Sequence, residues 1–217
     1  MLDGCNGLFL CRCFRFADPK EFDYLVINPA TEKWVTVPVP RRRSDQVGTA
    51  RLGFDPAFSS HFHVFVFQLD WFGDGHDDND GDGLVLGLKI YSSETGLWSY
   101  KHNGWSDELT LPSDCKSAFV NGMLYVVRAE FMIGAVDVEG KTWRIIDFPY
   151  SEKPFLDAAP GYIDVSQGQL HLAIGICDVT GHILGILVLE DGNSEEWTLK
   201  HPVSFEHLVG WQYVPSG

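Results

Sequence analysis

The chain has 217 residues, of which 45% are hydrophobic and 21% charged, and its formal net charge is −14. This composition is too apolar for a disordered protein and supplies enough side chains for a sizeable core. The negative charge argues against binding to nucleic acid or to anionic membranes, because both require a basic protein surface.

The N-terminus, the cysteines and the apolar runs indicate the compartment of the protein. The N-terminus lacks the basic segment and the long apolar segment of a signal peptide. The five cysteines form an odd, scattered set, which is typical of free thiols in a reducing compartment. The longest apolar runs have the length of a strand and cannot span a bilayer. We therefore expect a cytoplasmic or nuclear protein without membrane contact.

Four stretches of seven residues each run from a turn-forming residue to a tryptophan. They are 28–34, 92–98, 137–143 and 191–197. Each follows an apolar, strand-like run, and each tryptophan begins another β-prone run, so the pattern predicts a hairpin. We expect the tryptophans to fill the space between neighbouring sheets. These residues are Trp34, Trp98, Trp143 and Trp197.

A second turn signal precedes these hairpins. Asn-Gly dipeptides between apolar runs, the strongest short hairpin signal, end at Gly7 and Gly122, and a Gln-Gly variant ends at Gly168. The second unit has Phe54-Asp55-Pro56 before the alternating run 61–67 instead. Each unit is therefore predicted to contain four strands, two around the first turn and two around the turn before the tryptophan.

The repeat predicts an all-β chain of β-propeller type. Trp98 and Trp143 are 45 residues apart, which is the length of one propeller blade. The chain reads as a single domain with about four four-stranded blades, at about 2–40, 48–112, 115–150 and 160–202, and a tail at 203–217. Propellers have four to eight blades. Four units form either a small ring or part of a larger one with an exposed edge.

No motif for catalysis or for a cofactor is found. Gly134 and Gly140-Lys141-Thr142 resemble a phosphate loop, but five residues separate the two glycines instead of four. The loop would also present Asp137 and Glu139, which repel phosphate. Motifs for a serine nucleophile or a zinc protease are missing from the sequence. We predict no catalytic residue, no cofactor and no enzymatic activity.

The acidic stretch 70–83 interrupts the second unit. Asp78, Asp80 and Asp82 follow the first half of a calcium-binding loop, but Lys89 occupies the twelfth position, where that loop requires glutamate. The flanking segments also read as strands instead of helices. We therefore predict a solvated insertion and no metal site.

Two segments are candidates for contact with a partner protein. Trp71 and Phe72 are large apolar residues at the root of the acidic loop, and such residues are frequent anchors at interfaces. We expect the acidic side chains Asp78, Asp80 and Asp82 of the same loop to contact the partner as well. Arg41, Arg42 and Arg43 form the one basic cluster of the sequence and fit either an exposed loop between blades or an acidic partner.

Several short motifs in a fixed order resemble one known family. They are Cys5–Leu8, Ile27–Trp34, Leu52–Pro56, Ile90–Trp98 and Val136–Trp143. In this order they resemble the associated domain of plant F-box proteins, a propeller related in architecture to kelch propellers. The resemblance covers about residues 4–205.

The resemblance implies a substrate-recognition role. Members carry an F-box that docks on the Skp-type adaptor of a ubiquitin ligase, while the propeller presents a target protein for ubiquitin-dependent degradation. This sequence begins at the first blade, so adaptor binding is expected only if an F-box is supplied upstream. The target is unknown. Two alternatives stay open: a propeller enzyme or calcium-stabilised sugar-binding propeller, and a truncated fragment without function.

Overall fold

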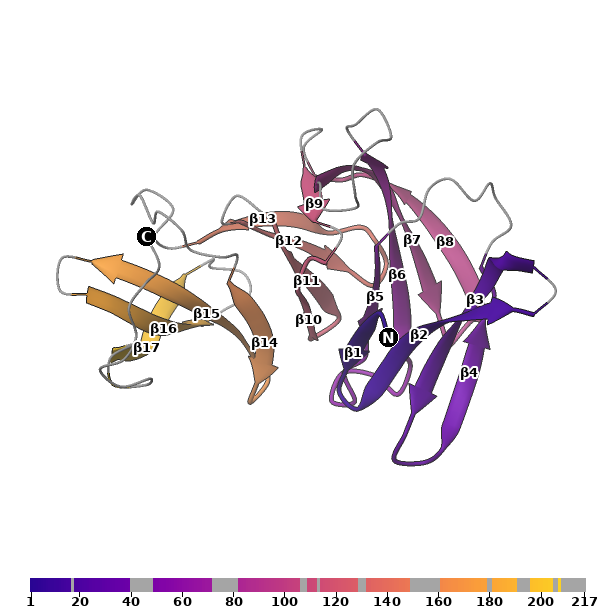
Figure 1. Ribbon diagram of the computed structural model, residues 1–217, viewed down its shortest axis with the longest axis horizontal. Helices are drawn as coiled ribbons and strands as arrows, with labels where there is room; N and C mark the ends of the chain where they lie inside the picture. The colour runs from indigo at the N-terminus through magenta and orange to yellow at the C-terminus, as the bar shows by residue number, and fades with distance from the viewer. Residues whose placement is uncertain are drawn as a thin grey trace.

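The computed structural model contains four antiparallel β-sheets arranged like successive blades of a propeller (Figure 1). The structure describes residues 1–16, 18–39, 49–71, 82–105, 109–112, 114–128, 132–148, 161–178, 181–190, 196–204 and 207. Within these ranges, no helix has the length and apolar character needed to cross a membrane. The predicted all-β chain with about four four-stranded blades is confirmed.

Consecutive strands form each sheet, with four strands in the first, third and fourth sheets and five in the second. The first sheet contains β1 (Asp3–Cys5), β2 (Leu8–Arg15), β3 (Asp18–Asn28) and β4 (Lys33–Val37). The second contains β5 (Ala50–Gly53), β6 (His63–Trp71), β7 (Asp82–Ser92) and β8 (Leu97–His102), with β9 (Thr110–Pro112) added to β7. The third contains β10 (Ser117–Val120), β11 (Met123–Val127), β12 (Met132–Asp137) and β13 (Trp143–Asp147). The fourth contains β14 (Tyr162–Ser166), β15 (Gln169–Asp178), β16 (Gly181–Leu189) and β17 (Trp197–Ser204).

Two-residue turns join the two innermost strands of the first, third and fourth sheets. Both residues of each turn have positive φ, which is the geometry of the tight turn that fits the natural twist of a hairpin. The φ values are 44° and 80° at Asn6-Gly7, 52° and 77° at Asn121-Gly122, and 52° and 74° at Gln167-Gly168. Glycine adopts this conformation without the steric cost that a Cβ atom brings, which explains the fixed place of Gly7, Gly122 and Gly168.

Side chains alternate between the two faces of each strand, and the apolar ones pack against the next sheet. Three apolar clusters result, one between each pair of successive sheets. Leu10, Val26, Leu52 and Val64 are central to the cluster between the first and second sheets. Phe65, Phe67, Leu124 and Val136 are central to the next. Ile133, Ile146, Leu172 and Leu187 are central to the cluster between the third and fourth sheets.

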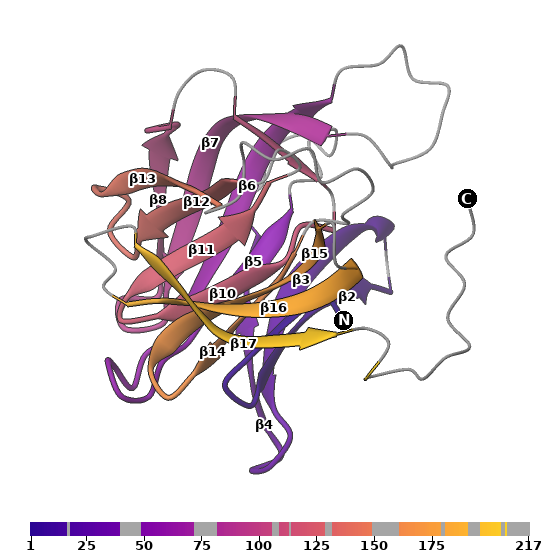
Figure 2. The same ribbon diagram turned by 90° about the vertical axis from the view of Figure 1, so that its left-hand side faces the viewer.

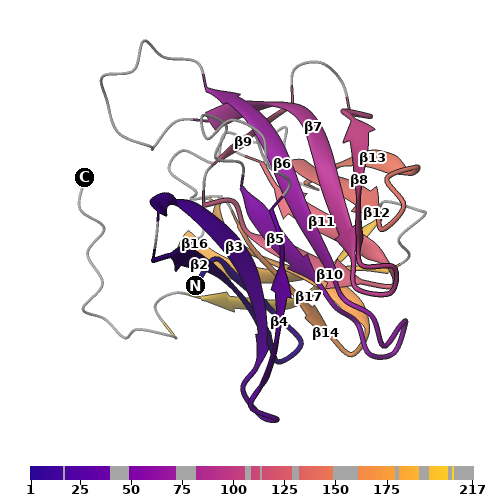
Figure 3. The ribbon, with the colours of Figure 1, turned by 90° about the vertical axis from the view of Figure 1, so that its right-hand side faces the viewer.

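The row of sheets has two ends. The fourth sheet faces the viewer in Figure 2 and the first sheet does so in Figure 3. Among the described residues, the core clusters join the first sheet to the second, the second to the third, and the third to the fourth, and none joins the fourth sheet to the first. The sheets therefore form an open series and not a closed ring.

Candidate functional site

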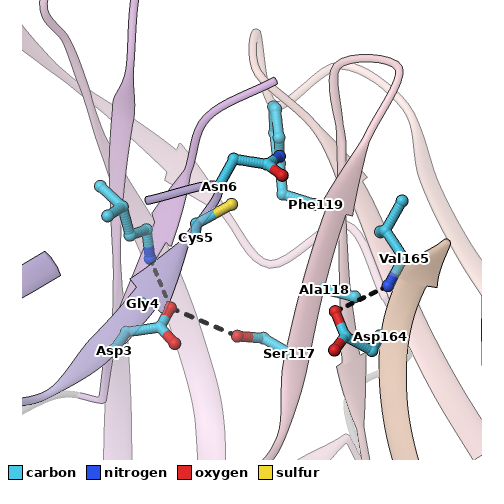
Figure 4. Close-up of a pocket in the computed structure, with 10 residues that line it drawn as sticks. Asp3, Gly4, Cys5, Asn6, Ser117, Ala118, Phe119, Asp164 and Val165 are labelled. Carbon is cyan, nitrogen blue, oxygen red and sulfur yellow. Dashed lines mark hydrogen bonds between the residues drawn. The ribbon is translucent and has the colours of Figure 1, made fainter. Parts of the chain in front are cut away.

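The innermost strands of all four sheets meet around a small pocket of about 70 Å³ (Figure 4). Residues 3–6 of the first sheet line one side, and Asp164 and Val165 of the fourth sheet line the other. Leu52 and the segment 117–119 contribute from the two sheets between them. In a propeller this is the position of the central channel, so the pocket is where loops and strands of different blades become neighbours.

Asp3 of the pocket accepts hydrogen bonds from two other sheets. Its Oδ2 accepts a hydrogen bond of 2.7 Å from the backbone N–H of Leu52 and one of 3.4 Å from the hydroxyl of Ser117. Burial raises the pKa of Asp3 above 3.8, although these hydrogen bonds and the charge of Arg51 act in the opposite direction. Asp3 thus connects the first sheet to the second and third through one carboxyl group.

The other two reactive groups of the pocket differ in exposure. The thiol of Cys5 is half-buried and donates to the carbonyl oxygen of Phe54 at 3.2 Å. Burial raises the pKa of Cys5 to about 11, so the group is a neutral thiol near pH 7. Asp164 is exposed, and its Oδ1 accepts a hydrogen bond of 2.7 Å from the N–H of Val165. A protonated thiol is a poor nucleophile, which argues against covalent chemistry at Cys5.

The size and composition of the pocket favour surface recognition. Small-molecule sites usually enclose about 300–1,000 Å³, several times the volume found here. Among the described residues, no three histidine, cysteine or acidic side chains lie close enough to hold a metal ion. The pocket instead presents an exposed amide at Asn6 and an exposed carboxylate at Asp164. These groups can accept and donate hydrogen bonds to a partner that covers the inner strands.

A buried arginine that the sequence motifs did not reveal supports this region. Arg51 is 6% exposed, and its Nε donates to the carbonyl oxygen of Cys115 at 3.1 Å. Its Nη1 donates to the carbonyl oxygen of Ala50 at 2.8 Å, and its Nη2 also contacts Cys115. The guanidinium therefore ties β5 to the segment that leads into β10. The position of Arg51 between apolar residues is the one feature of the sequence that could have indicated a buried arginine here.

The residues predicted for partner contact lie at or beyond the limits of the described structure. The backbone of Trp71 pairs with Gly83 at the end of the β6–β7 hairpin, and the backbone of Asp82 pairs with Pro112 of β9. Phe72, Asp78 and Asp80 lie outside the described residues, and so do Arg41, Arg42 and Arg43.

The segment that resembles a phosphate loop is the turn between β12 and β13. The carboxylate of Asp137 accepts hydrogen bonds from the backbone N–H groups of Glu139, Lys141 and Thr142 at 3.1, 2.9 and 2.9 Å. Partial burial acts to raise the pKa of Asp137, but the hydrogen bonds from this turn outweigh it and lower the pKa below 3.8. An internal carboxylate thus occupies the amides that a phosphate would need.

Three of the four repeated tryptophans contact other elements. Trp98 Nε1 donates to the carbonyl oxygen of Pro38 at 2.8 Å, and Trp197 Nε1 donates to that of Asp147 at 3.2 Å, so each reaches the preceding sheet. Trp143 packs edge-to-face on Trp105, with ring centroids 4.7 Å apart. Trp34 departs from the predicted packing, because its side chain is 66% exposed. Among the described sheets, none packs against this face of the first sheet.

Trp105 is a second group that the repeat did not reveal. It follows β8 and is 5% exposed. Its Nε1 donates to the carbonyl oxygen of Arg144 at 2.9 Å, and its ring stacks on Phe67 with centroids 5.9 Å apart. The insertion after β8 therefore fills the space between the second and third sheets beside Trp143.

The match to a family model agrees with this architecture. The family model described as "F-box protein At3g26010-like, beta-propeller" matches residues 1–217. No curated protein matches the chain. Among solved structures, a structural genomics protein of unknown function from Bacteroides thetaiotaomicron aligns at 13% identity with a TM-score of 0.37, over 88% of this chain. The alignment covers 40% of that protein's length. The family match over residues 1–217 confirms the predicted resemblance, and the chain belongs to the family of F-box protein At3g26010-like β-propellers.

Proposed function

We propose that the chain is a non-catalytic protein-interaction module that holds a target protein, as the substrate-recognition arm of an SCF-type ubiquitin ligase. The observation that carries this proposal is the match to a β-propeller family of F-box proteins over residues 1–217. An F-box supplies the link to the ligase, so the propeller is the part left to select the target. The Skp-type adaptor would bind only through an F-box supplied upstream, and the complex would act in the cytoplasm or nucleus.

The geometry of the inner strands supports binding over catalysis. The pocket of about 70 Å³ is too small to enclose a sugar or nucleotide, and its thiol is protonated near pH 7. Its rim carries exposed polar groups from both end sheets, Asn6 and Asp164. Such a rim, with strands of several blades behind it, fits a side chain or loop of a partner better than a small substrate.

The charge of the chain indicates the kind of target. The net charge of −14 attracts basic segments and repels acidic ones. Asp78, Asp80 and Asp82 add local negative charge, and Trp71 and Phe72 supply apolar anchors for the same partner. We therefore propose a target with a basic segment, held by the acidic loop and the rim of the pocket. Arg41, Arg42 and Arg43 would contact an acidic part of the same target.

A gain-of-function experiment tests this proposal. The chain is fused to an upstream F-box and expressed in cells, and ubiquitylated peptides are quantified by mass spectrometry. We expect a small set of proteins whose ubiquitylation rises with the fusion and returns to baseline when Asp164→Arg or a replacement of 72–81 by Gly and Ser is introduced. The F-box alone is the control.

Two results of this experiment would contradict or narrow the proposal. If the fusion enters the ligase complex but raises ubiquitylation of no protein above the F-box control, the recognition role is wrong. If targets appear but neither variant reduces them, recognition stands and the binding surface lies elsewhere on the propeller. The alternative of a propeller enzyme predicts instead that the isolated chain turns over a substrate without any F-box.

A further inference from the structure

Each sheet carries one line of side chains that runs across its strands and ends on the repeated tryptophan. We call this line the tryptophan row. In the second sheet, strand pairing aligns Leu52, Val64, Tyr91 and Trp98. In the third sheet it aligns Phe119, Leu124, Val136 and Trp143. In the fourth sheet it aligns Val165 with Leu170, and Leu189 with Trp197. In the first sheet it aligns Gly4, Phe9, Ile27 and Trp34.

Three of these rows are contact surfaces between sheets. The rows of the second, third and fourth sheets belong to the three apolar clusters that join each sheet to the one before it. In two of them the tryptophan also donates a hydrogen bond to the preceding sheet. The acceptors, the carbonyl oxygens of Pro38 and Asp147, each lie four residues after the tryptophan of the accepting sheet.

The row of the first sheet also ends on a tryptophan and is apolar, with Gly4 at its first position, but no other described sheet packs on it. Trp34 is 66% exposed and Phe9 is 38% exposed, while Ile27 between them is half-buried. Aromatic side chains exposed in a line are costly for a free surface and are typical of an interface. The rows of the second, third and fourth sheets each pack on the preceding sheet. We therefore expect the row of the first sheet to bind a sheet as well.

We propose that the fourth sheet of a second copy of the chain covers the tryptophan row of the first sheet. Among the described residues, no core cluster joins another sheet to the row of the first sheet or to the opposite face of the fourth sheet. On that face, strand pairing aligns Tyr162, Ala173, Ile186 and His201. Tyr162 is 59% exposed, and His201 lies four residues after Trp197. The carbonyl oxygen of His201 is therefore the counterpart of the acceptors Pro38 and Asp147 for Trp34.

In such a dimer, the first and the fourth sheet of each copy are both in contact with the other copy. The first sheet of each copy packs on the fourth sheet of the other, so a two-fold axis relates two identical contacts and each of the four end sheets has a neighbour. The ring then has eight blades, within the range that propellers use. The pocket is lined by Asp3 of the first sheet and Asp164 of the fourth, so it lies beside the two sheets that the partner copy covers.

Charge sets the conditions under which this contact forms. Each copy carries a net charge of −14, so two copies repel each other at low ionic strength. Salt screens this repulsion but leaves the apolar contact of Phe9, Ile27 and Trp34 in place. The dimer is therefore favoured by added salt, which is the opposite of a contact held by ion pairs.

Sedimentation velocity of the full chain over a dilution series, at low and at high salt, tests the proposal. We expect a dimer for the unchanged chain and tighter association at high salt. Trp34→Ser and Tyr162→Asp should each lower the association constant by about thirtyfold or more, since buried aromatic anchors dominate interfaces. Leu97→Ser is the matched control, because Leu97 is 69% exposed on the second sheet, away from both faces. Thermal unfolding confirms that each variant is folded.

A mixing experiment identifies which faces meet. The Trp34→Ser and Tyr162→Asp variants, combined in equal amounts, should form a mixed dimer that keeps one intact contact and sediments above either variant alone. A monomer at both salt concentrations for the unchanged chain would overturn the proposal. So would a Tyr162→Asp variant that remains dimeric while Trp34→Ser is monomeric, because the first sheets would then face each other. Loss of the dimer in Leu97→Ser would also contradict it.

Discussion

Trp98 in the second sheet and Trp34 in the first occupy the same position of the same repeat and meet different surroundings. Trp98 is half-buried, contacts Tyr91 with ring centroids 5.4 Å apart, and donates to the first sheet. Trp34 pairs with Ile27 in the same register, yet its side chain is 66% exposed. The two residues have identical local sequence roles, so the neighbouring sheet alone makes the difference.

In this repeat protein, the place of a residue in the repeat does not determine whether its side chain is buried. A blade specifies its own hairpins through turns and alternation, but each of its faces is stabilised only by the next blade. The enclosed faces of the second and third sheets should therefore carry most of the stability of the chain. The outward face of the first sheet should contribute little until something covers it. This difference can be tested by measuring the stability of variants in dilute protein, where two copies of the chain do not associate.

The largest difference is expected between two phenylalanines. Phe65 is fully buried between the second and third sheets, with its ring centroid 6.1 Å from that of Phe119. Phe65→Ala should lower the free energy of unfolding by about 3–5 kcal/mol, because it leaves a cavity in an enclosed contact. Phe9→Ala, on the outward face of the first sheet, should cost about 1 kcal/mol or less. Urea unfolding measures both, and equal losses would refute the distinction.

The two tryptophans should respond differently to the same conservative change. Trp98→Phe removes the N–H that donates to Pro38, so we expect a loss of about 1 kcal/mol. Trp34→Phe removes no hydrogen bond recorded among the described residues, and its effect should stay within about 0.5 kcal/mol. Paired thermal melts of the two variants provide the measurement. A larger loss for Trp34→Phe would indicate that this row is already covered within one chain.

A pH-dependent difference is expected at the pocket. Burial raises the pKa of Asp3, so the folded state holds this proton more tightly than the unfolded state does. The contribution of Asp3 to stability is therefore full below pH 3.8 and is lost as the pH rises through its folded-state pKa. Asp3→Asn keeps an acceptor for the N–H of Leu52 and removes this loss.

The measurement for Asp3 is the free energy of unfolding of both chains between about pH 3 and 7. The variant should gain stability relative to the unchanged chain as the pH rises. Asp164→Asn is the matched control, since Asp164 lines the same pocket with an exposed side chain. A gain at Asp164 equal to that at Asp3, or none at Asp3, would show that burial of Asp3 is not the cause.

The smallest effect concerns reactivity and not stability. Cys13 is exposed on the same face of β2 as Phe9, whereas Cys5 is half-buried beside the pocket. With a pKa of about 11, Cys5 has roughly a hundredfold less thiolate near pH 8 than a thiol with an ordinary pKa of 9.0. Iodoacetamide should therefore label Cys13 well before Cys5, as peptide mass spectrometry can follow. Comparable labelling rates would mean that the inner strand of the first sheet is open to solvent.

Much of the fold was predictable because its signals are local. Asn6-Gly7 and Asn121-Gly122 specify tight hairpins through the conformation of two residues each, and the structure has positive φ at all four. The alternation of side chains and the four tryptophans then indicated hairpins and sheets. The groups that join sheets carry no such signal. Arg51 meets Cys115 across 64 residues, and Trp105 reaches Arg144 across 39 residues, so no short pattern predicts either contact.

Local sequence patterns predicted the hairpins, their turns and the place of each tryptophan at the start of a strand. These features depend on backbone geometry and strand register, which neighbouring residues control. Which tryptophans are buried could not be predicted in this way, because burial depends on the presence of an adjacent sheet. Only the tertiary structure decided that Asp3 and Asp164, 161 residues apart in the numbering, share one pocket. Trp34 shows the boundary between the two: the repeat specified its place on the sheet, and the open end of the series left it exposed.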